Sequence, residues 1–167
     1  ELRKGKMSPD ECRAALSKGN YFGTMLVKMG VADCLLGGAT YSTADTVRPA
    51  LQLVKTKPGS KSVSSCFLLV RERPDGSEEK YIMGDCAINI EPSAEELAET
   101  AIECARSARI FGIDPKVAML SFSTKGSAKG EKVDKVTTAL ALAKEAAPDL
   151  AIDGELQFDA AFSPVVA

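Results

Sequence analysis

The stretch GGATYSTADTVRPAL, residues 37–51, lies between an apolar run and an amphipathic pattern, and it sets the local fold. The apolar run, residues 32–36, predicts a short buried strand, and the two glycines after it predict a turn. Apolar side chains then recur at the spacing of one helix face from Val47 to Val54. The pattern therefore predicts a helix over about residues 43–56, which Lys57-Pro58-Gly59 ends.

The beginning of this helix is a candidate anion site. Ser42, with Asp45 three residues later, resembles a capping box in which Asp takes the usual place of Glu. A strand, a glycine turn and a helix start together leave backbone N–H groups unpaired at the positive end of the helix dipole, which suits a phosphate. Arg48 adds a cation, and Ser42 and Thr43 add hydroxyl donors. The same pattern also fits an ordinary strand–turn–helix unit in which Arg48 lies on a solvated face.

Composition excludes several classes of function. At 167 residues, with 45% hydrophobic and 26% charged residues, the chain has the size and balance of one soluble globular domain. A net charge of −2 gives no support for a nucleic-acid surface, and no apolar run reaches the length of a membrane span. The first residues carry no signal-peptide pattern. The absence of histidine excludes Ser-His-Asp and Cys-His catalysis, a histidine base and histidine-ligated zinc.

The cysteines indicate a reducing compartment. They are odd in number, widely spaced and without a CxxC pair, so they predict reduced, mostly buried thiols of a cytosolic protein with no bound metal. The five positions are Cys12, Cys34, Cys66, Cys86 and Cys104.

Helical and strand patterns alternate along the chain. The expected helices span residues 8–29 (with a break near Gly19-Asn20), 43–56, 93–111 and 131–147, and the last residues, 165–167, are also expected in a helix. The expected strands span residues 32–36, 65–72, 80–90 (the last two as an antiparallel hairpin), 117–122 (buried on both faces) and 150–152, with a turn at 153–155. This alternation predicts an α/β fold, a layered αβα domain around a mixed sheet.

A second candidate site follows the expected strand 117–122. Residues 121–130 lie at the carboxyl end of that strand, where open α/β sheets bind ligands, and they offer hydroxyls, two lysines and two glycines. Neither the Walker A order nor a dinucleotide fingerprint occurs here. A solvated surface loop is the alternative interpretation. The carboxylates of residues 152–161 fit acid–base groups or, as we favour from the pattern alone, charges at a helix end.

Five segments together resemble the phosphate acetyltransferase (phosphotransacetylase) family, within the phosphate acetyl/butyryltransferases. They are YFGTM (residues 21–25), STADTVRPALQ (42–52), DCAINI (85–90), AMLSFSTKGSAK (118–129) and DGELQFDAA (153–161). The resemblance covers essentially the whole chain in the right order, which is more specific than any one motif.

The resemblance implies reversible acetyl transfer between the CoA thiol and phosphate, with acetyl-CoA and acetyl phosphate as substrates and no further cofactor or metal. It also implies a cytoplasmic homodimer with the isocitrate/isopropylmalate dehydrogenase-like fold, whose active site lies between two α/β domains, and no nucleic-acid or membrane partner. In the family's mechanism an aspartate base deprotonates the thiol, and the thiolate attacks the acetyl phosphate carbonyl directly.

The family's substrate-binding residues map onto this sequence by motif. Arg48 matches an arginine that binds substrate, and Arg3 matches another, linked to CoA, within a shorter motif. Ser42 and Thr43 would line the acetyl phosphate site. The opposite side of the cleft would be lined by Thr124, Lys125, Gly126 and Ser127. An exposed surface charge is the alternative interpretation of Arg3.

The chain is expected to be an excised middle domain, because family members begin before Glu1 and continue past Ala167. Residues 1–30 would be a helical segment leading in from the missing domain, and residues 31–167 the α/β domain of the cleft and the dimer. The missing part would carry the catalytic aspartate, so no catalytic residue is expected here and the piece alone should be nearly inactive. Two alternatives are a phosphate butyryltransferase and a non-catalytic acetyl-CoA-sensing oligomerisation module, like the domain fused to some malic enzymes.

Overall fold

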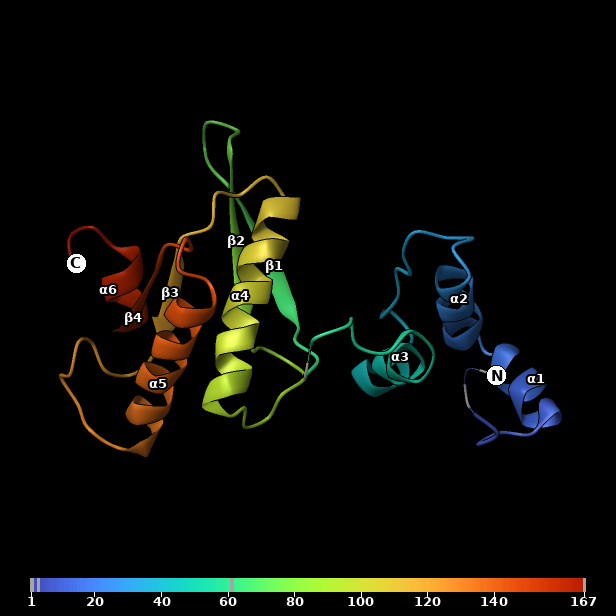
Figure 1. The fold of residues 1–167 in the computed structure, drawn as a ribbon. Coiled ribbons are helices and arrows are strands. Elements are labelled where there is room, and N and C mark those ends of the chain that lie inside the picture. The colour runs from blue at the N-terminus through green and yellow to red at the C-terminus, as the bar shows by residue number, and fades with distance from the viewer. Residues whose placement is uncertain (1, 3, 61, 167) are drawn as a thin grey trace. The chain divides into compact units, whose positions relative to one another are not determined.

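The chain folds into two compact units, Glu1–Gly59 and Ser60–Ala167, and each is described by itself (Figure 1). The computed structural model describes residues 2, 4–60 and 62–166. The expected division between residues 30 and 31 falls inside the first unit. As a statement about the domains of a whole enzyme, that division stays a prediction.

The described part of the first unit is helical. It contains α1 (Pro9–Leu16), α2 (Gly19–Lys28), α3 (Thr43–Pro49) and a π-helical turn η1 (Ala50–Val54). The predicted helical stretch 8–29 is confirmed with its break, since Ser17 caps the end of α1 and Lys18 the start of α2. The predicted helix 43–56 is also found, but it changes at Pro49 from α-helical to π-helical geometry.

Pro49 explains this change and how α2 and α3 are joined. Proline has no N–H, so the carbonyl of Asp45, four residues earlier, lacks its normal helical donor. The side-chain amide of Asn20 replaces that donor, with its Nδ2 atom 2.6 Å from the Asp45 carbonyl oxygen. Asn20 and Pro49 are both buried, so the replacement bond lies within the contact between α2 and α3.

The predicted strand at residues 32–36 is wrong. In the structure this run is irregular, and Leu36 is 96% exposed. A strand needs a neighbour to pair with its backbone groups, and no described segment pairs with this one. Its apolar composition alone therefore does not produce a strand here.

The second unit contains two separate two-stranded sheets. Strands β1 (Cys66–Glu72) and β2 (Glu78–Gly84) form an antiparallel hairpin, while β3 (Val117–Leu120) and β4 (Ile152–Leu156) pair in parallel. The α/β class and the hairpin are confirmed, although the second hairpin strand begins and ends earlier than the predicted 80–90. The single mixed sheet is not found among the described residues, because no hydrogen bonds join the two pairs of strands.

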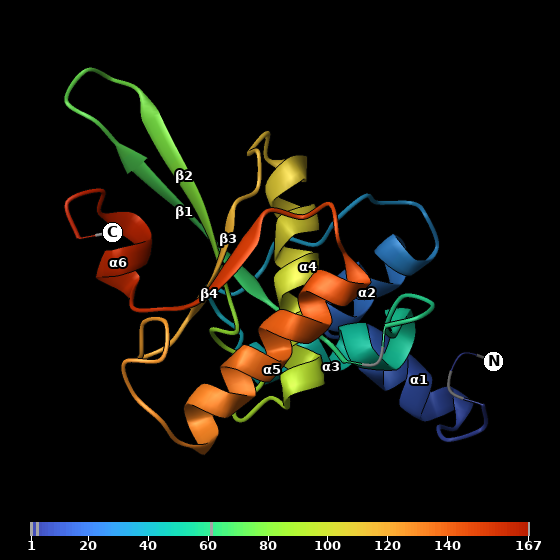
Figure 2. The ribbon, with the colours of Figure 1, turned by 60° about the vertical axis from the view of Figure 1, so that its left-hand side comes forward.

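Helices α4 (Ala94–Ile110) and α5 (Glu131–Ala146) pack against each other and against the strands, and the short α6 (Phe158–Phe162) follows β4 (Figures 1 and 2). Both long helices were predicted nearly to their ends, and the capping box of Ser93 and Glu96 at the start of α4 is present. Small side chains allow the close helix contact. The buried cluster consists of Ala98, Ala101, Met119, Ala139, Leu140, Ala143 and Ile152.

Strand β3 is shorter and less buried than expected. The prediction of residues 117–122 buried on both faces is wrong: Met119 is buried, whereas Ala118 and Leu120 are exposed. Successive side chains of a strand point to opposite faces. Met119 therefore belongs to the core that α4 and α5 cover, and its two neighbours face away from it.

Strand β4 corrects the expected turn at residues 153–155, which instead lie inside the strand. A Cβ atom at Gly154 would lie 2.8 Å from the Met119 carbonyl oxygen, so only glycine allows β3 and β4 to approach this closely. Met119 pairs with Gly154 and Leu120 pairs with Leu156, which leaves Glu155 as the extra residue of a β-bulge. The helix expected at 165–167 is not found, because residues 164–166 form a turn and Ala167 lies outside the described residues.

The cysteines are free thiols, as predicted, but they are not mostly buried. Cys34 and Cys86 are exposed and the other three are half-buried. Their apolar neighbours in the sequence are themselves often exposed, notably along β1. Among the helices of the described residues, none has the length and apolar character needed to cross a membrane.

Candidate functional site

The hydroxyl of Ser42 forms its hydrogen bonds within the first turn of α3. Its Oγ accepts a hydrogen bond from the Asp45 N–H at 3.1 Å, and its O–H donates to Asp45 Oδ2 at 2.7 Å. These bonds form only half of the expected capping box. The aspartate side chain is one methylene shorter than that of glutamate, and its carboxylate accepts from the Ser42 hydroxyl. Asp45 also places a carboxylate at the N-terminus of a seven-residue helix. An anion at the N-terminus of α3 would therefore need a positive charge from another residue.

Arg48 is the group that can supply the charge. It is exposed in the last turn of α3 and borders a hollow of about 380 Å³. The hollow is otherwise lined by Ala44, Val47, Leu51 and Gln52. No ion pair of Arg48 is recorded within residues 2, 4–60 and 62–166. A guanidinium beside an apolar wall can bind a phosphate-bearing molecule that also carries an apolar portion.

The second candidate group forms a tight turn after β3. The N–H of Ser127 donates to the carbonyl of Thr124 at 3.1 Å, and the two residues between them, Lys125 and Gly126, have φ of +48° and +82°. Positive φ at both central positions is the geometry of a type I′ turn, which a glycine favours at the second of them. All four predicted residues of this loop therefore belong to one turn.

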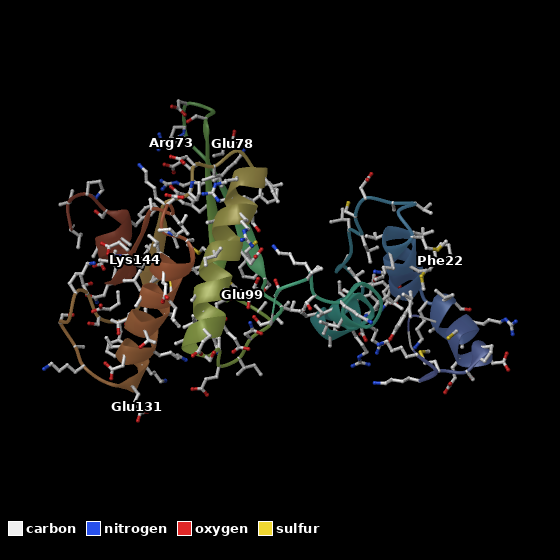
Figure 3. The ribbon with its side chains drawn as sticks, viewed as in Figure 1. Phe22, Arg73, Glu78, Glu99, Glu131 and Lys144 are labelled. Carbon is white, nitrogen blue, oxygen red and sulfur yellow. The ribbon has the colours of Figure 1, made fainter. Side chains whose placement is uncertain are left out.

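The ammonium of Lys125 is already paired with β4. Its Nζ donates to Asp153 Oδ1 at 2.6 Å and to the Gly154 carbonyl at 2.9 Å. Lys144 of α5, labelled in Figure 3, lies 3.9 Å from the same carboxylate oxygen. The Lys125 hydrogen bond lowers the pKa of Asp153, and the N–H of Gly154 and the two lysine charges lower it further. An anion would have to compete with Asp153 for Lys125.

Glu155 is the residue that the sequence interpretation missed. It is 4% exposed, and its carboxylate accepts a hydrogen bond from the Gly126 N–H at 2.6 Å. The sequence pattern placed it in a turn at residues 153–155 and favoured charges at a helix end for the carboxylates of residues 152–161, which include Glu155. Gly154, a glycine beside a strand pattern, was the signal that could have predicted a bulge and an inward side chain.

The structure thus places the predicted residues in two groups. Ser42, Thr43 and Arg48 belong to α3 and its cap in the first unit, and the turn Thr124–Ser127 belongs to the second unit. Arg3 lies outside the described residues. The assignment of these residues to a substrate site rests on the resemblance and stays a prediction.

Comparison with known proteins places the whole chain in one family. Residues 1–167 match the family model described as Phosphate acetyl/butaryl transferase. The chain belongs to this family. A phosphate acetyltransferase of Bacillus subtilis (strain 168) is 58% identical over 167 residues, and one of Staphylococcus epidermidis (strain ATCC 12228) is 55% identical over 172 residues. Both alignments cover all of this chain and about half of the relative (50% and 51%), so the chain spans about half the length of these curated relatives.

Solved structures of family members have the same local architecture. A phosphotransacetylase from Streptococcus pyogenes matches with a TM-score of 0.87 and 58% identity, over 98% of this chain and 49% of that one. The EutD phosphotransacetylase from Staphylococcus aureus matches with a TM-score of 0.85 and 53% identity, over 99% of this chain and 50% of that one. A branched-chain phosphotransacylase from Enterococcus faecalis shares the fold at 24% identity, with a TM-score of 0.59.

Proposed function

We propose that this chain is part of a phosphate acetyltransferase that interconverts acetyl-CoA and phosphate with acetyl phosphate and CoA. The observation that carries the proposal is the identity of 53–58% to phosphate acetyltransferases along the full length of the chain. The high identity to relatives named phosphate acetyltransferases favours acetyl transfer.

In this proposal Arg48 binds a phosphate group of the substrate, and Ser42 and Thr43 lie beside the acetyl phosphate. Both substrates carry several negative charges, and a fixed guanidinium is the side chain best suited to a phosphate. The exposure of Arg48 and the hollow beside it support this assignment. The turn Thr124–Ser127 also contributes to substrate binding in this proposal, and Arg3 contacts CoA.

The proposed reaction transfers the acetyl group directly to sulfur. An aspartate outside this chain takes the proton of the CoA thiol, because the thiolate rather than the thiol is the nucleophile. The sulfur then forms a bond to the acetyl carbonyl carbon while the bond from that carbon to the phosphate oxygen breaks. Phosphate leaves with the electron pair, and no acyl-enzyme forms. This chain contributes substrate binding and orientation rather than the base.

The same proposal covers the assembly and place of the enzyme. The parent protein would be a cytoplasmic homodimer of the isocitrate/isopropylmalate dehydrogenase-like fold, with the active site between two α/β domains. CoA and acetyl-CoA would be substrates, and no cofactor or metal would be needed.

The test compares the full-length parent with the isolated chain of residues 1–167. We expect the parent to form acetyl-CoA from acetyl phosphate and CoA, followed by thioester absorbance, and to do so faster than with butyryl phosphate. The isolated chain, checked for folding by circular dichroism, should give no arsenate-dependent breakdown of acetyl-CoA above background, because half a site cannot align the reactants. An inactive parent would refute the proposed function. Turnover by the isolated chain would refute the proposal that the catalytic base lies outside this chain.

A further inference from the structure

Glu155 is a buried carboxylate aimed at the turn that follows β3. It occupies the bulge between the Met119–Gly154 and Leu120–Leu156 pairs, and bulges redirect side chains. One oxygen, Oε1, accepts from the Gly126 N–H at 2.6 Å and from the Ser123 hydroxyl at 3.0 Å. Its main-chain carbonyl accepts from the Lys125 N–H at 3.1 Å. Two of these bonds join Glu155 to the turn, and the third joins it to Ser123, the residue before the turn.

The other backbone donors of the turn are also bound within the protein. The Thr124 N–H donates to Ser127 Oγ at 3.0 Å, and the Ser127 N–H donates back to the Thr124 carbonyl at 3.1 Å. The Ala128 N–H donates to Ser123 Oγ at 3.0 Å, and the Ser123 side chain is fully buried. Every backbone N–H from residue 124 to 128 thus has an acceptor in the protein. The turn does not offer its amides to a phosphate, because the Gly126 N–H is bound by the Glu155 carboxylate and the other four amides by other acceptors of the protein.

The contacts of Glu155 favour its ionised form and lower its pKa. The Gly126 N–H is the largest influence that lowers the pKa of Glu155, and its own backbone N–H, the Ser123 hydroxyl and the charge of Lys125 act in the same direction. Removal of the carboxylate would leave the Gly126 N–H without its acceptor. The Ser123 hydroxyl would keep only its longer contacts, to Ser127 Oγ at 3.4 Å and to the Ala128 carbonyl at 3.5 Å. An unpaired donor is unfavourable, so the turn would rearrange rather than keep its shape.

We propose that Glu155 is a positioning residue for acyl transfer, which acts by holding the turn Thr124–Ser127 in the one conformation that fits the substrate. The proposal rests on the proposed function of the parent protein. Glu155 itself touches no substrate. It acts through the turn, whose Thr124 Oγ1 accepts in addition from the Gln157 N–H at 2.9 Å.

The test uses the full-length parent with Glu155→Ala and Glu155→Gln, and with Glu145→Ala and Glu145→Gln as matched controls on an exposed glutamate of α5. The readouts are kcat, the KM of each substrate, urea unfolding, and hydrogen exchange of the peptide that contains residues 123–128. We expect Glu155→Ala to lower kcat about 100-fold, because a shift of about 1 Å in a positioning element has that effect, with KM changed much less. Glu155→Gln should recover part of kcat, since its amide oxygen still accepts from the Gly126 N–H.

The turn should exchange its amide hydrogens roughly tenfold faster or more in folded Glu155→Ala, as expected for the loss of charge-assisted hydrogen bonds. A folded Glu155→Ala enzyme with wild-type kcat would overturn the proposal. So would a loss of kcat that only follows the unfolded fraction, because that marks a structural role. If the wild-type parent shows no acetyl transfer, the proposed function fails, and the exchange rates alone still decide whether Glu155 holds the turn.

Discussion

The two candidate groups differ in how much of their chemistry is already used inside the protein. Arg48 stands exposed beside a hollow, and no ion pair of it is recorded within the described residues. In the turn Thr124–Ser127, by contrast, the amides, the Ser127 hydroxyl and the Lys125 ammonium all have partners within the loop or on β4. Both segments combine hydroxyl residues, a cation and glycines in the sequence. Their contacts show that one can offer a charge, whereas the other offers a fixed shape.

This difference separates the effects expected from substitution. A residue that offers a charge to a ligand contributes to binding and little to stability, because it has few partners in the folded protein. A residue that fixes a shape contributes to both, since its loss leaves other groups unpaired. Activity and stability measured together on the same variants therefore test whether the two groups are correctly distinguished.

The largest effect is expected at Arg48. Arg48→Ala in the full-length parent should lower kcat/KM for acetyl phosphate roughly 10- to 150-fold, since a hydrogen bond to a charged group contributes about 1.5–3 kcal/mol. The free energy of unfolding measured in urea should stay within about 0.5 kcal/mol of the wild-type value. Arg48→Lys should recover only part of the loss, because a lysine cannot form the two-pronged contact.

Arg109→Ala is the control for this experiment, since it removes an exposed arginine from the last turn of α4. It should leave kcat/KM unchanged. Wild-type kcat/KM in Arg48→Ala would show that Arg48 does not belong to the substrate site. It would also contradict the contrast between Arg48 as an exposed charge and the turn Thr124–Ser127 as a fixed shape.

A smaller effect, on stability, is expected at Asn20. Asn20→Ala should destabilise the parent by about 1–3 kcal/mol in urea unfolding, because the Asp45 carbonyl beside Pro49 loses its donor within a buried contact. The double variant with Pro49→Ala decides the cause, since alanine restores an N–H to the helix. We expect the two changes to couple by about 0.5 kcal/mol or more. Strict additivity of the two unfolding energies would rule out this role of Asn20.

The sequence predicted what depends on neighbours along the chain. The capping box of α4, the hairpin of β1 and β2, and a helix break near Gly19-Asn20 all follow from local residues, and all are found, with the break at residues 17 and 18. The apolar run 32–36 predicts a strand, but a strand also needs a pairing partner, which local sequence does not reveal. The residues at which β3 begins and ends, and the separation of the four strands into two sheets, also depend on which strands pair with each other.

The residues of the candidate site show the same difference between contacts that are local in sequence and contacts that are distant. Ser42 as a helix cap was predictable, because the cap bonds a residue only three positions away. Glu155 was not, because its partners at Ser123 and Gly126 lie 32 and 29 residues earlier and the bulge that directs it arises from strand register. The pairing of Lys125 with Asp153 spans 28 residues and was missed for the same reason.

The smallest effect is expected at Asp153, which forms an exposed ion pair with Lys125. Asp153→Asn should destabilise the parent by no more than about 1 kcal/mol at neutral pH, because solvent and salt screen exposed pairs. The pKa of Asp153 is lowered in the folded state, so its contribution is present above the ordinary carboxyl pKa of about 4 and is lost as the pH falls through its folded pKa. The urea stabilities of Asp153→Asn and wild type should therefore converge in acid and in high salt, while Glu145→Gln should show no such trend. A loss above about 2 kcal/mol that persists in high salt would mean that Lys125 and Asp153 are as integral to the turn as Glu155, and that the turn is held by two carboxylates rather than one.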